Sequence, residues 1–331
     1  MQIVTLPDAQ SRSLASSYAL IVSPYQDYAK SLRQLYRLFS TIPDDIQTGI
    51  FAFTNDPASS GALLVDNLPI DLDLPPTPLD GRTPQAKGTF YSECSLLGLA
   101  QSIGLPVGYK SEKDGNPIHH VVPVPGGEDT QSNEGSRVFL AFHNDSMFDD
   151  SMIFNSHNPD FLLLLCVRAD PDGEAKTYYA DARRLWAELD QETRQVLRDT
   201  RFRMAAPSNY TRFLSGKASG KKVWSPPVPI FSGPVQYPEI CLAANGVMAI
   251  DPGAVQALGR LLAACQVVGE DNSIALRPGQ ALIVNNRKGV HARSHFRASY
   301  DGHDRWLMRA NIRTNLWSIR DRVTDIPYVF R

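Results

Sequence analysis

The chain has 331 residues, with 33 Lys and Arg against 35 Asp and Glu, so its formal net charge at pH 7 is −2. Hydrophobic residues make up 43% of the chain and charged residues 21%, which are ordinary proportions for a globular protein and exclude a disordered or fibrous one. The nearly balanced charge gives no electrostatic reason to expect a nucleic acid or an anionic membrane as partner.

The cysteines and the N-terminal sequence indicate the compartment. Cys94, Cys166, Cys241 and Cys265 are far apart and form no Cys-x-x-Cys pair, and three of them lie in apolar stretches. Buried, reduced thiols are typical of a reducing compartment. The first 25 residues lack the unbroken apolar stretch of a signal peptide, and no apolar run approaches the ~20 residues that span a bilayer. We therefore expect a cytoplasmic protein.

The first third of the chain predicts helices and one short strand. Residues 24–40 carry apolar and aromatic side chains at spacings of three and four, which predicts an amphipathic helix. Residues 61–65 predict a short strand, and residues 71–84 predict a proline-rich loop. A second helix is expected over 90–103, because glycine and proline follow it.

From residue 121 onward the sequence is typical of strands. Short apolar runs bounded by turn residues lie at 121–124, 137–142, 161–167, 281–284, 289–291 and 306–312. Helices are expected over 181–199 and over 252–268, the second with Asp251 as its N-cap. Residues 206–238, rich in Pro, Gly, Ser and Lys, predict a lid. Because strands and helices do not alternate regularly, we expect a mainly β fold, an antiparallel sandwich or barrel with flanking helices.

The clearest chemical signal is a possible metal site. His143 and Asp145 are two residues apart, so on a strand both side chains would point to one face. His291, at the end of a strand-like run, is the candidate third ligand. Two histidines and one carboxylate form the facial triad of non-haem Fe(II) oxygenases, which leaves positions open for a co-substrate and O₂. Alone, His-x-Asp also fits an ordinary hydrogen-bonded histidine, and His119 and His120 are expected to be structural.

Two arginines follow the candidate metal ligands. Arg305 lies fourteen residues after His291, and arginine is a permanent, bidentate partner for a carboxylate. Arg305 and Arg309 are four residues apart on a predicted strand and so share a face. Without the histidines, such a pair would predict only a solvated, salt-bridged strand edge.

With these residues the chain resembles the clavaminate synthase-like (TauD-related) group of Fe(II)/2-oxoglutarate-dependent oxygenases. The likeness is strongest to the hydroxylases of free lysine, arginine and asparagine. It covers roughly residues 50–317. The matching segments are 61–69, 74–78, 121–124, 131–145, 160–171, 285–293 and 300–309.

The resemblance implies a single oxygenase domain over residues 1–331. Its core is a double-stranded β-helix, or jelly roll, over 121–317, with 20–105 as a supporting region and 206–238 as the lid. It also implies that His143, Asp145 and His291 bind Fe(II). Since related halogenases carry a small residue in place of the carboxylate, the aspartate implies hydroxylation or desaturation.

The resemblance also assigns the co-substrate site. Arg305 would bind the distal carboxylate of 2-oxoglutarate, and Thr177 would support the co-substrate. Arg309 would lie near the co-substrate or the substrate. Thr177 also fits an ordinary β-branched strand residue, so its role depends on the resemblance alone.

The substrate side departs from the lysine and arginine hydroxylases. Glu112 matches a residue that meets the substrate α-amino group, although it also fits an exposed loop, and Asn133 matches a polar substrate contact. Where the basic-substrate enzymes carry acids, this chain has Ala243 and Asn245. The resemblance therefore implies a neutral amino acid, or a small molecule derived from one such as a cyclic dipeptide, in natural-product biosynthesis. Glu239 lies nearby and keeps a lysine hydroxylase as the alternative.

Two readings from other classes remain open at this point. A non-catalytic jelly-roll binding protein would keep the fold without the chemistry, but the metal triad and Arg305 are intact. A zinc hydrolase could use two histidines and an aspartate, but it leaves Arg305 unexplained. The expected partner is in each case a small molecule, and no oligomeric state follows from the sequence.

Overall fold

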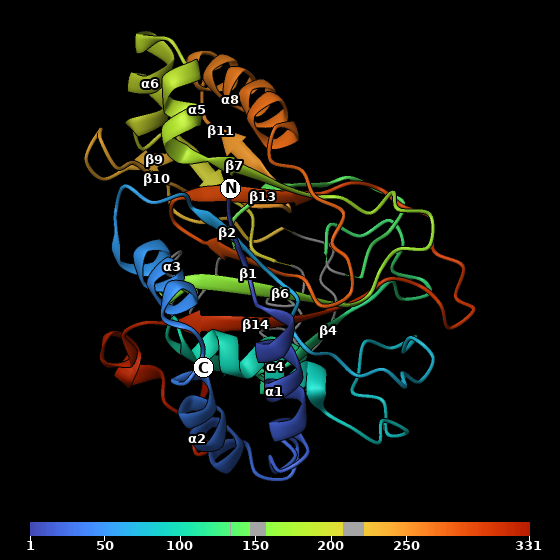
Figure 1. Cartoon of the computed structure of the whole chain (residues 1–331). Helices are drawn as coiled ribbons and strands as arrows, with labels where there is room; N and C mark the ends of the chain where they lie inside the picture. Colours follow the sequence, from blue (N-terminus) through green and yellow to red (C-terminus); the bar gives the residue numbers. More distant parts are fainter. Residues whose placement is uncertain (133, 146–156, 208–221) are drawn as a thin grey trace.

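The computed structural model in Figure 1 describes residues 1–132, 134–145, 157–207 and 222–331. Its largest feature is an eight-stranded sheet with the order β1-β2-β12-β6-β14-β3-β15, in which β4 also pairs with β14. In chain order the strands are β1 (Gln2–Thr5), β2 (Ala62–Asp66), β3 (Leu105–Tyr109), β4 (His119–Val121), β6 (Phe161–Arg168), β12 (Ala281–Asn285), β14 (Trp306–Arg313) and β15 (Val329–Phe330). Neighbours are antiparallel, except that β1 is parallel to β2 and β15 to β3.

The N-terminal helices pack on one face of this sheet. They are α1 (Asp8–Tyr18), α2 (Tyr28–Phe39), α3 (Asp44–Asn55) and α4 (Tyr91–Gln101). Met308 and Ala310 of β14 and Leu163 of β6 share a buried core with them. Because side chains alternate along a strand, Leu307 and Arg309 point to the opposite face, which leaves them free to line a cavity. The helix predicted over 90–103 is confirmed as α4, and the one predicted over 24–40 is confirmed as α2, which begins only at Tyr28.

A smaller sheet of three strands, β5-β13-β7, forms the second layer (Figure 1). Its strands are β5 (Leu140–His143), β7 (Thr177–Asp181) and β13 (Gly289–Arg293). A second core holds this sheet against α5 (Ala182–Glu188), α6 (Gln191–Arg198) and α8 (Pro252–Glu270), through buried residues such as Phe142, Leu185 and Leu261. The remaining elements are β8 (Phe202–Met204), β9 (Phe231–Ser232), β10 (Glu239–Ile240), β11 (Val247–Ala249), η1 (Lys113–Gly115) and η2 (Leu316–Arg322). The described fold is thus mainly β with flanking helices, as expected.

Three predicted elements differ in their bounds. The single helix expected over 181–199 is two helices, because Leu189 is extended and the Asp190 side chain accepts a hydrogen bond from the Thr193 N–H and starts α6. The strand expected at 121–124 is β4, which ends at Val121. The strand expected at 137–142 is β5, which begins later. The N-cap at Asp251 is confirmed, since its side chain accepts from the Ala254 N–H.

Two predictions fall outside the described residues. They are Asn133 and the segment 208–221 of the predicted lid. In the part of the chain that the structure describes, no helix is both long enough and apolar enough to cross a membrane.

Candidate active site

A cavity of about 450 Å³ opens between the two sheets. The three-stranded sheet contributes His143, Thr177 and His291, and the eight-stranded sheet contributes Leu307 and Arg309. Other lining residues are Glu112, His119, Asp145, Leu164, Arg293, Arg305 and the segment 243–245. Every site residue predicted from the sequence that the structure describes therefore lies around one cavity.

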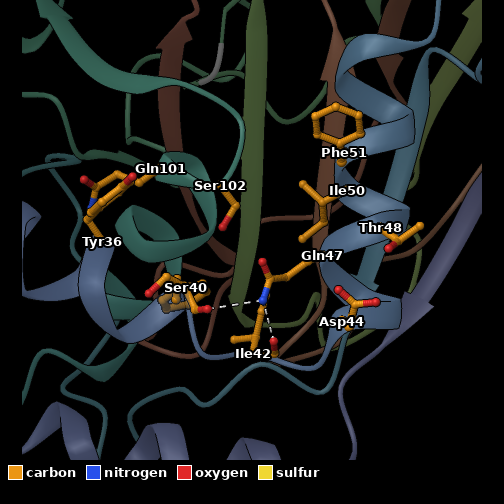
Figure 2. Close-up of a pocket in the computed structure, with 11 residues that line it drawn as sticks. Tyr36, Ser40, Ile42, Asp44, Gln47, Thr48, Ile50, Phe51, Gln101 and Ser102 are labelled. Carbon is orange, nitrogen blue, oxygen red and sulfur yellow. Dashed lines mark hydrogen bonds between the residues drawn. The ribbon is translucent and has the colours of Figure 1, made fainter.

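A second pocket of the same volume lies at the surface beside α2 and α3 (Figure 2). Gln47 occupies its floor and donates hydrogen bonds to the carbonyl oxygens of Ser40 at 3.2 Å and Ile42 at 2.7 Å. Its lining residues include no histidine, cysteine or arginine, and Asp44 is the one carboxylate among them. This pocket offers no set of metal ligands, so of these two pockets only the cavity between the sheets has them.

His143, Asp145 and His291 converge in the cavity. His143 and His291 are cross-strand partners on β5 and β13, and their ring centres are 4.3 Å apart. His143 Nε2 lies 3.5 Å from Asp145 Oδ1, and one ligand atom from each of the three residues lies within 4.8 Å of the others. His143 Nδ1 is 2.7 Å from the Ala141 carbonyl oxygen. Because a carbonyl only accepts, Nδ1 donates, which leaves Nε2 as the ligand atom.

Two of the three groups hold the protonation state that a metal requires. Burial favours the neutral carboxyl of Asp145, but the charge of the Arg309 guanidinium outweighs it, so the pKa of Asp145 lies well below its usual range. Burial, and then the neighbouring His143 ring, lower the pKa of His291 to about 3. Near neutral pH the site therefore presents a carboxylate and a neutral imidazole, which fits Fe(II).

Arg309 connects the metal triad to the substrate side of the cavity. It donates to Asp145 Oδ2 at 2.8 Å and to Glu112 Oε2 at 2.8 Å, and its third contact is with His119 Nδ1 at 2.8 Å. Burial alone would lower the pKa of Arg309, but the two carboxylates raise it above its usual value. The guanidinium therefore stays charged and compensates acids on both sides of it.

Arg305, by contrast, contacts no acid among the described residues. It is only 6% exposed, and no described residue forms an ion pair or a hydrogen bond with its guanidinium, whose centre lies 5.7 Å from the Phe296 ring. Burial lowers the pKa of Arg305. A buried charge without a counter-charge is unfavourable, so the cavity wall is suited to an anion that comes from outside the chain.

Arg293 lies near Arg305, and Thr177 is its cross-strand partner. Thr177 and Arg293 face each other across the β7–β13 pair, and both line the cavity. Arg293 donates to the Ser294 carbonyl oxygen at 2.9 Å and lies 5.1 Å from the Phe296 ring. Burial, and then Arg305, lower the pKa of Arg293 to about 9. Two buried guanidinium groups thus flank one phenyl ring, which makes this end of the cavity strongly electropositive.

One part of the cavity lining consists of small, neutral residues. It is formed by Ala205, Pro207, Ala243, Ala244 and Asn245. The Asn245 amide donates weakly to the Ala206 carbonyl oxygen at 3.4 Å, so the amide is almost free to contact a ligand.

The acids of the cavity lining are mostly neutralised within the protein. Glu112 and Asp145 share Arg309, and Glu134 pairs with Lys113 at 3.1 Å. Asp114 is exposed. Glu239, which the sequence left as a possible acid in the wall, is instead exposed and pairs with Arg287 at 3.7 Å, outside the described lining.

Sequence reasoning missed two residues of the cavity. His119 was expected to be structural. It lies on β4, directly opposite Arg309 of β14, and contacts the Arg309 guanidinium. Only His120, on the other face, is structural, where it contacts Tyr25 and Trp306. Arg293 carried one usable signal, since it follows His291 by two residues on a strand and so shares its face.

Comparison with known proteins gives the family. Residues 88–311 match the family described as taurine catabolism dioxygenase TauD, TfdA family. The chain is 34% identical to the L-asparagine oxygenase of Streptomyces coelicolor, over 83% of this chain and 77% of that protein. It is 27% identical to clavaminate synthase 2 of Streptomyces clavuligerus, over 95% of this chain and 92% of that protein.

A solved structure agrees with the family match and with the two related sequences. The crystal structure of asparagine oxygenase in complex with Fe(II), 2S,3S-3-hydroxyasparagine and succinate superposes with a TM-score of 0.86 at 31% identity, over 100% of this chain and 99% of that one. The resemblance to the clavaminate synthase-like enzymes is thereby confirmed. Because a family match over most of the chain coincides with a cavity that brings two histidines and a carboxylate together, the chain belongs to the TauD/TfdA family and is an Fe(II)- and 2-oxoglutarate-dependent dioxygenase.

Proposed function

We propose that the protein hydroxylates an unactivated C–H bond of a neutral amino acid, or of a small molecule derived from one such as a cyclic dipeptide, in natural-product biosynthesis. The observation that carries the substrate class is the wall formed by Ala243, Ala244 and Asn245, which brings no acid to the cavity. Burying a cationic side chain there without a partner would be unfavourable.

The proposed roles follow the geometry of the cavity. His143, Asp145 and His291 would hold Fe(II), which together with 2-oxoglutarate and O₂ supplies the oxidising power for the reaction. Arg305 would pair with the distal carboxylate of 2-oxoglutarate, and Thr177 beside it would donate its hydroxyl hydrogen to the same group. The protein itself would orient the substrate C–H bond and exclude water from the cavity.

The remaining polar groups would orient the substrate. Glu112 is held by Arg309 and by the Asn311 amide at 3.2 Å, which fixes its carboxylate for contact with a substrate ammonium group. Arg309 carries the complementary charge for a substrate carboxylate. Asn245, and Asn133 outside the described residues, would contact the rest of the substrate.

The proposal extends to the architecture of the domain. The two facing sheets would be the two walls of a double-stranded β-helix over residues 121–317, within one domain of residues 1–331. Residues 20–105 would support the outer face of the larger sheet. Of the predicted lid 206–238, only the part before Ile230 would close over the substrate, because Ile230 and Phe231 are buried in the second core. The four cysteines are free and buried, which supports a reducing, cytoplasmic location.

The substrate class is tested with a panel of amino acids under identical conditions. Neutral candidates, including L-Asn, L-Gln, L-Leu and cyclic dipeptides, are expected to gain one oxygen atom, whereas L-Lys and L-Arg are converted at least about tenfold less efficiently, since an unpaired buried charge costs several kcal/mol. Mass spectrometry detects the hydroxylated product, and succinate release measures coupled turnover. Efficient conversion of L-Lys or L-Arg with no neutral substrate would overturn the assignment and favour the lysine hydroxylase alternative.

A gain-of-charge variant sharpens this test. Ala243→Asp places a carboxylate in the neutral wall and is expected to improve conversion of L-Lys relative to neutral candidates. Ala263→Asp, at an exposed position of α8, adds the same charge away from the cavity and is expected to leave the preference unchanged. Equal effects of the two variants would show that residue 243 does not face the substrate.

A further inference from the structure

Asp145 lies beyond the reach of the strand that precedes it. β5 ends at His143, and its pairing with β13 reaches only the His143–His291 pair. The two-residue spacing predicts both ligands on one strand, but the backbone hydrogen bonds of the sheet do not extend to Asp145. Another part of the chain must therefore hold its backbone.

That part is the side chain of Asn286, the first residue of the turn between β12 and β13. Asn286 Oδ1 accepts a hydrogen bond from the Asp145 N–H at 2.8 Å, and Nδ2 donates to the Asp145 carbonyl oxygen at 2.5 Å. A primary amide offers the same donor and acceptor as a peptide group. The asparagine side chain thus takes the place of the missing strand partner.

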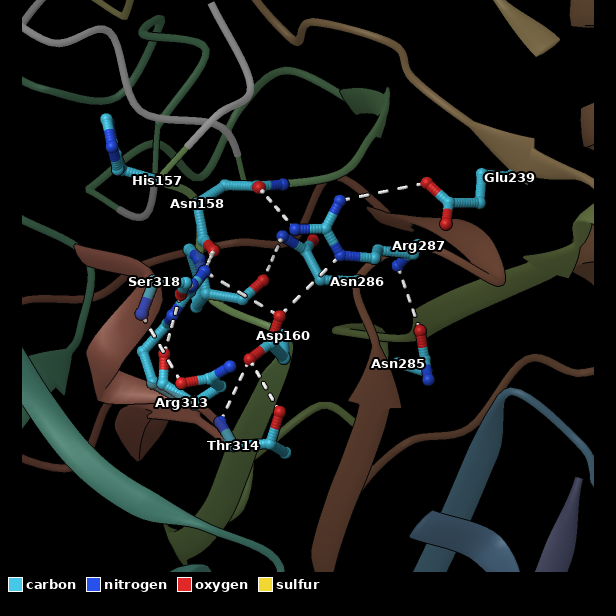
Figure 3. A network of polar contacts seen from close by, with 12 residues as sticks. His157, Asn158, Asp160, Glu239, Asn285, Asn286, Arg287, Arg313, Thr314 and Ser318 are labelled. Carbon is cyan, nitrogen blue, oxygen red and sulfur yellow. Dashed lines mark hydrogen bonds and ion pairs between the residues drawn. The ribbon is translucent and has the colours of Figure 1, made fainter. Parts of the chain in front are cut away.

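Asn286 is itself held on every side. It is 1% exposed, and Nδ2 also donates to the Pro159 carbonyl oxygen at 3.0 Å. Its backbone N–H donates to the Asp160 carbonyl oxygen at 2.9 Å, and its own carbonyl accepts from Asn144 Nδ2 at 3.1 Å. Figure 3 shows Asn286 among Asn158, Asp160 and Arg287 in this network. The amide cannot turn without breaking several hydrogen bonds.

We propose that Asn286 is a positioning residue that fixes Asp145 for metal binding. The inference rests on the proposed function, in which Asp145 is a metal ligand. Arg309 holds the Oδ2 atom of the same carboxylate, so Asn286 sets the backbone while Arg309 sets the rotation of the side chain. Together they leave Oδ1, the oxygen nearest His143, directed toward the metal site. This arrangement organises the ligand before the metal arrives.

The neighbouring Asn285 provides a matched control. Its Oδ1 accepts from the N–H groups of Arg287 and Lys288, both at 3.0 Å, and it makes no contact with Asp145. Asn285→Ala therefore removes turn hydrogen bonds at the same place in the fold without releasing the metal ligand. Any general weakening of the β12–β13 turn affects both variants, whereas release of Asp145 affects only Asn286→Ala.

The test measures the affinity of the metal-free protein for Mn(II) by the loss of the free-ion EPR signal. Compared with wild type, Asn286→Ala is expected to bind Mn(II) about tenfold to a hundredfold more weakly, the usual effect of losing a group that orients a ligand. Asn285→Ala is expected to bind like wild type. Circular dichroism confirms folding, and Asn286→Ser replaces Asn286→Ala if the latter is unfolded. A merely structural asparagine would lower the melting temperature without changing the Mn(II) affinity of the folded protein.

Asp145→Ala separates this inference from the proposed function. If Asp145→Ala loses Mn(II) binding while Asn286→Ala and Asn286→Ser bind as tightly as Asn285→Ala, the positioning role is wrong and the metal site stands. If Asp145→Ala itself binds Mn(II) like wild type, the metal assignment fails and the inference fails with it.

Discussion

Asp145→Ala, His143→Ala and His291→Ala are each expected to abolish turnover while leaving a folded protein. Three protein ligands leave no redundancy, and the groups around them can orient a ligand but cannot replace one. Folding should survive, because Arg309 keeps its contact with Glu112 when Asp145 is truncated. Succinate formation from 2-oxoglutarate measures turnover, and thermal unfolding checks the fold.

A matched histidine provides the control for this prediction. His295 lies four residues after His291 in the chain, but it is exposed and outside the described cavity lining. His295→Ala is expected to keep wild-type turnover. Full hydroxylation by Asp145→Ala would show that the carboxylate ligand has been assigned to the wrong residue.

The sequence predicted the site better than it predicted the local structure around it. His143, Asp145 and His291 were found from a two-residue spacing and a distant histidine, and the structure brings them together. His143 and Asp145 do not lie on one strand as the spacing predicted, because β5 ends before Asp145. The Asn286 side chain holds the Asp145 backbone instead. A side chain 141 residues away in the chain leaves no periodic signal near the motif it supports.

The missed parts share a physical cause, which is pairing between distant segments. The contact of His119 with Arg309 depends on the register of β4 against β14. Two adjacent histidines on a three-residue strand do not reveal which of them faces the cavity. The break between α5 and α6 was readable in principle, because Asp190 precedes Thr193 at the spacing of an N-cap. There the continuous apolar pattern of 181–199 outweighed the capping signal.

Arg305→Ala is expected to raise the apparent KM for 2-oxoglutarate by at least about a hundredfold, since losing one partner of a buried charge pair costs about 3–5 kcal/mol. The KM for the amino-acid substrate should change much less, because the proposed function assigns Arg305 to the co-substrate and the segment 243–245 to the substrate. Arg305→Lys is expected to recover part of the affinity, since it restores the charge but not the bidentate geometry. Steady-state kinetics with 2-oxoglutarate varied at fixed substrate measures both effects.

The effect of Arg305→Ala on stability shows whether Arg305 serves co-substrate binding or the fold. Without co-substrate, Arg305 is a buried charge that forms no ion pair with a described residue, and burial lowers its pKa despite the more distant charge of Asp170. The metal-free Arg305→Ala variant should therefore melt at the same temperature as the metal-free wild type or higher. Added 2-oxoglutarate should raise the melting temperature of the wild type but not that of the variant. Arg297→Ala, at an exposed neighbouring position, should change neither quantity. A KM within a few-fold of wild type, or a large loss of stability without co-substrate, would mean that Arg305 serves the fold and that another cation binds 2-oxoglutarate.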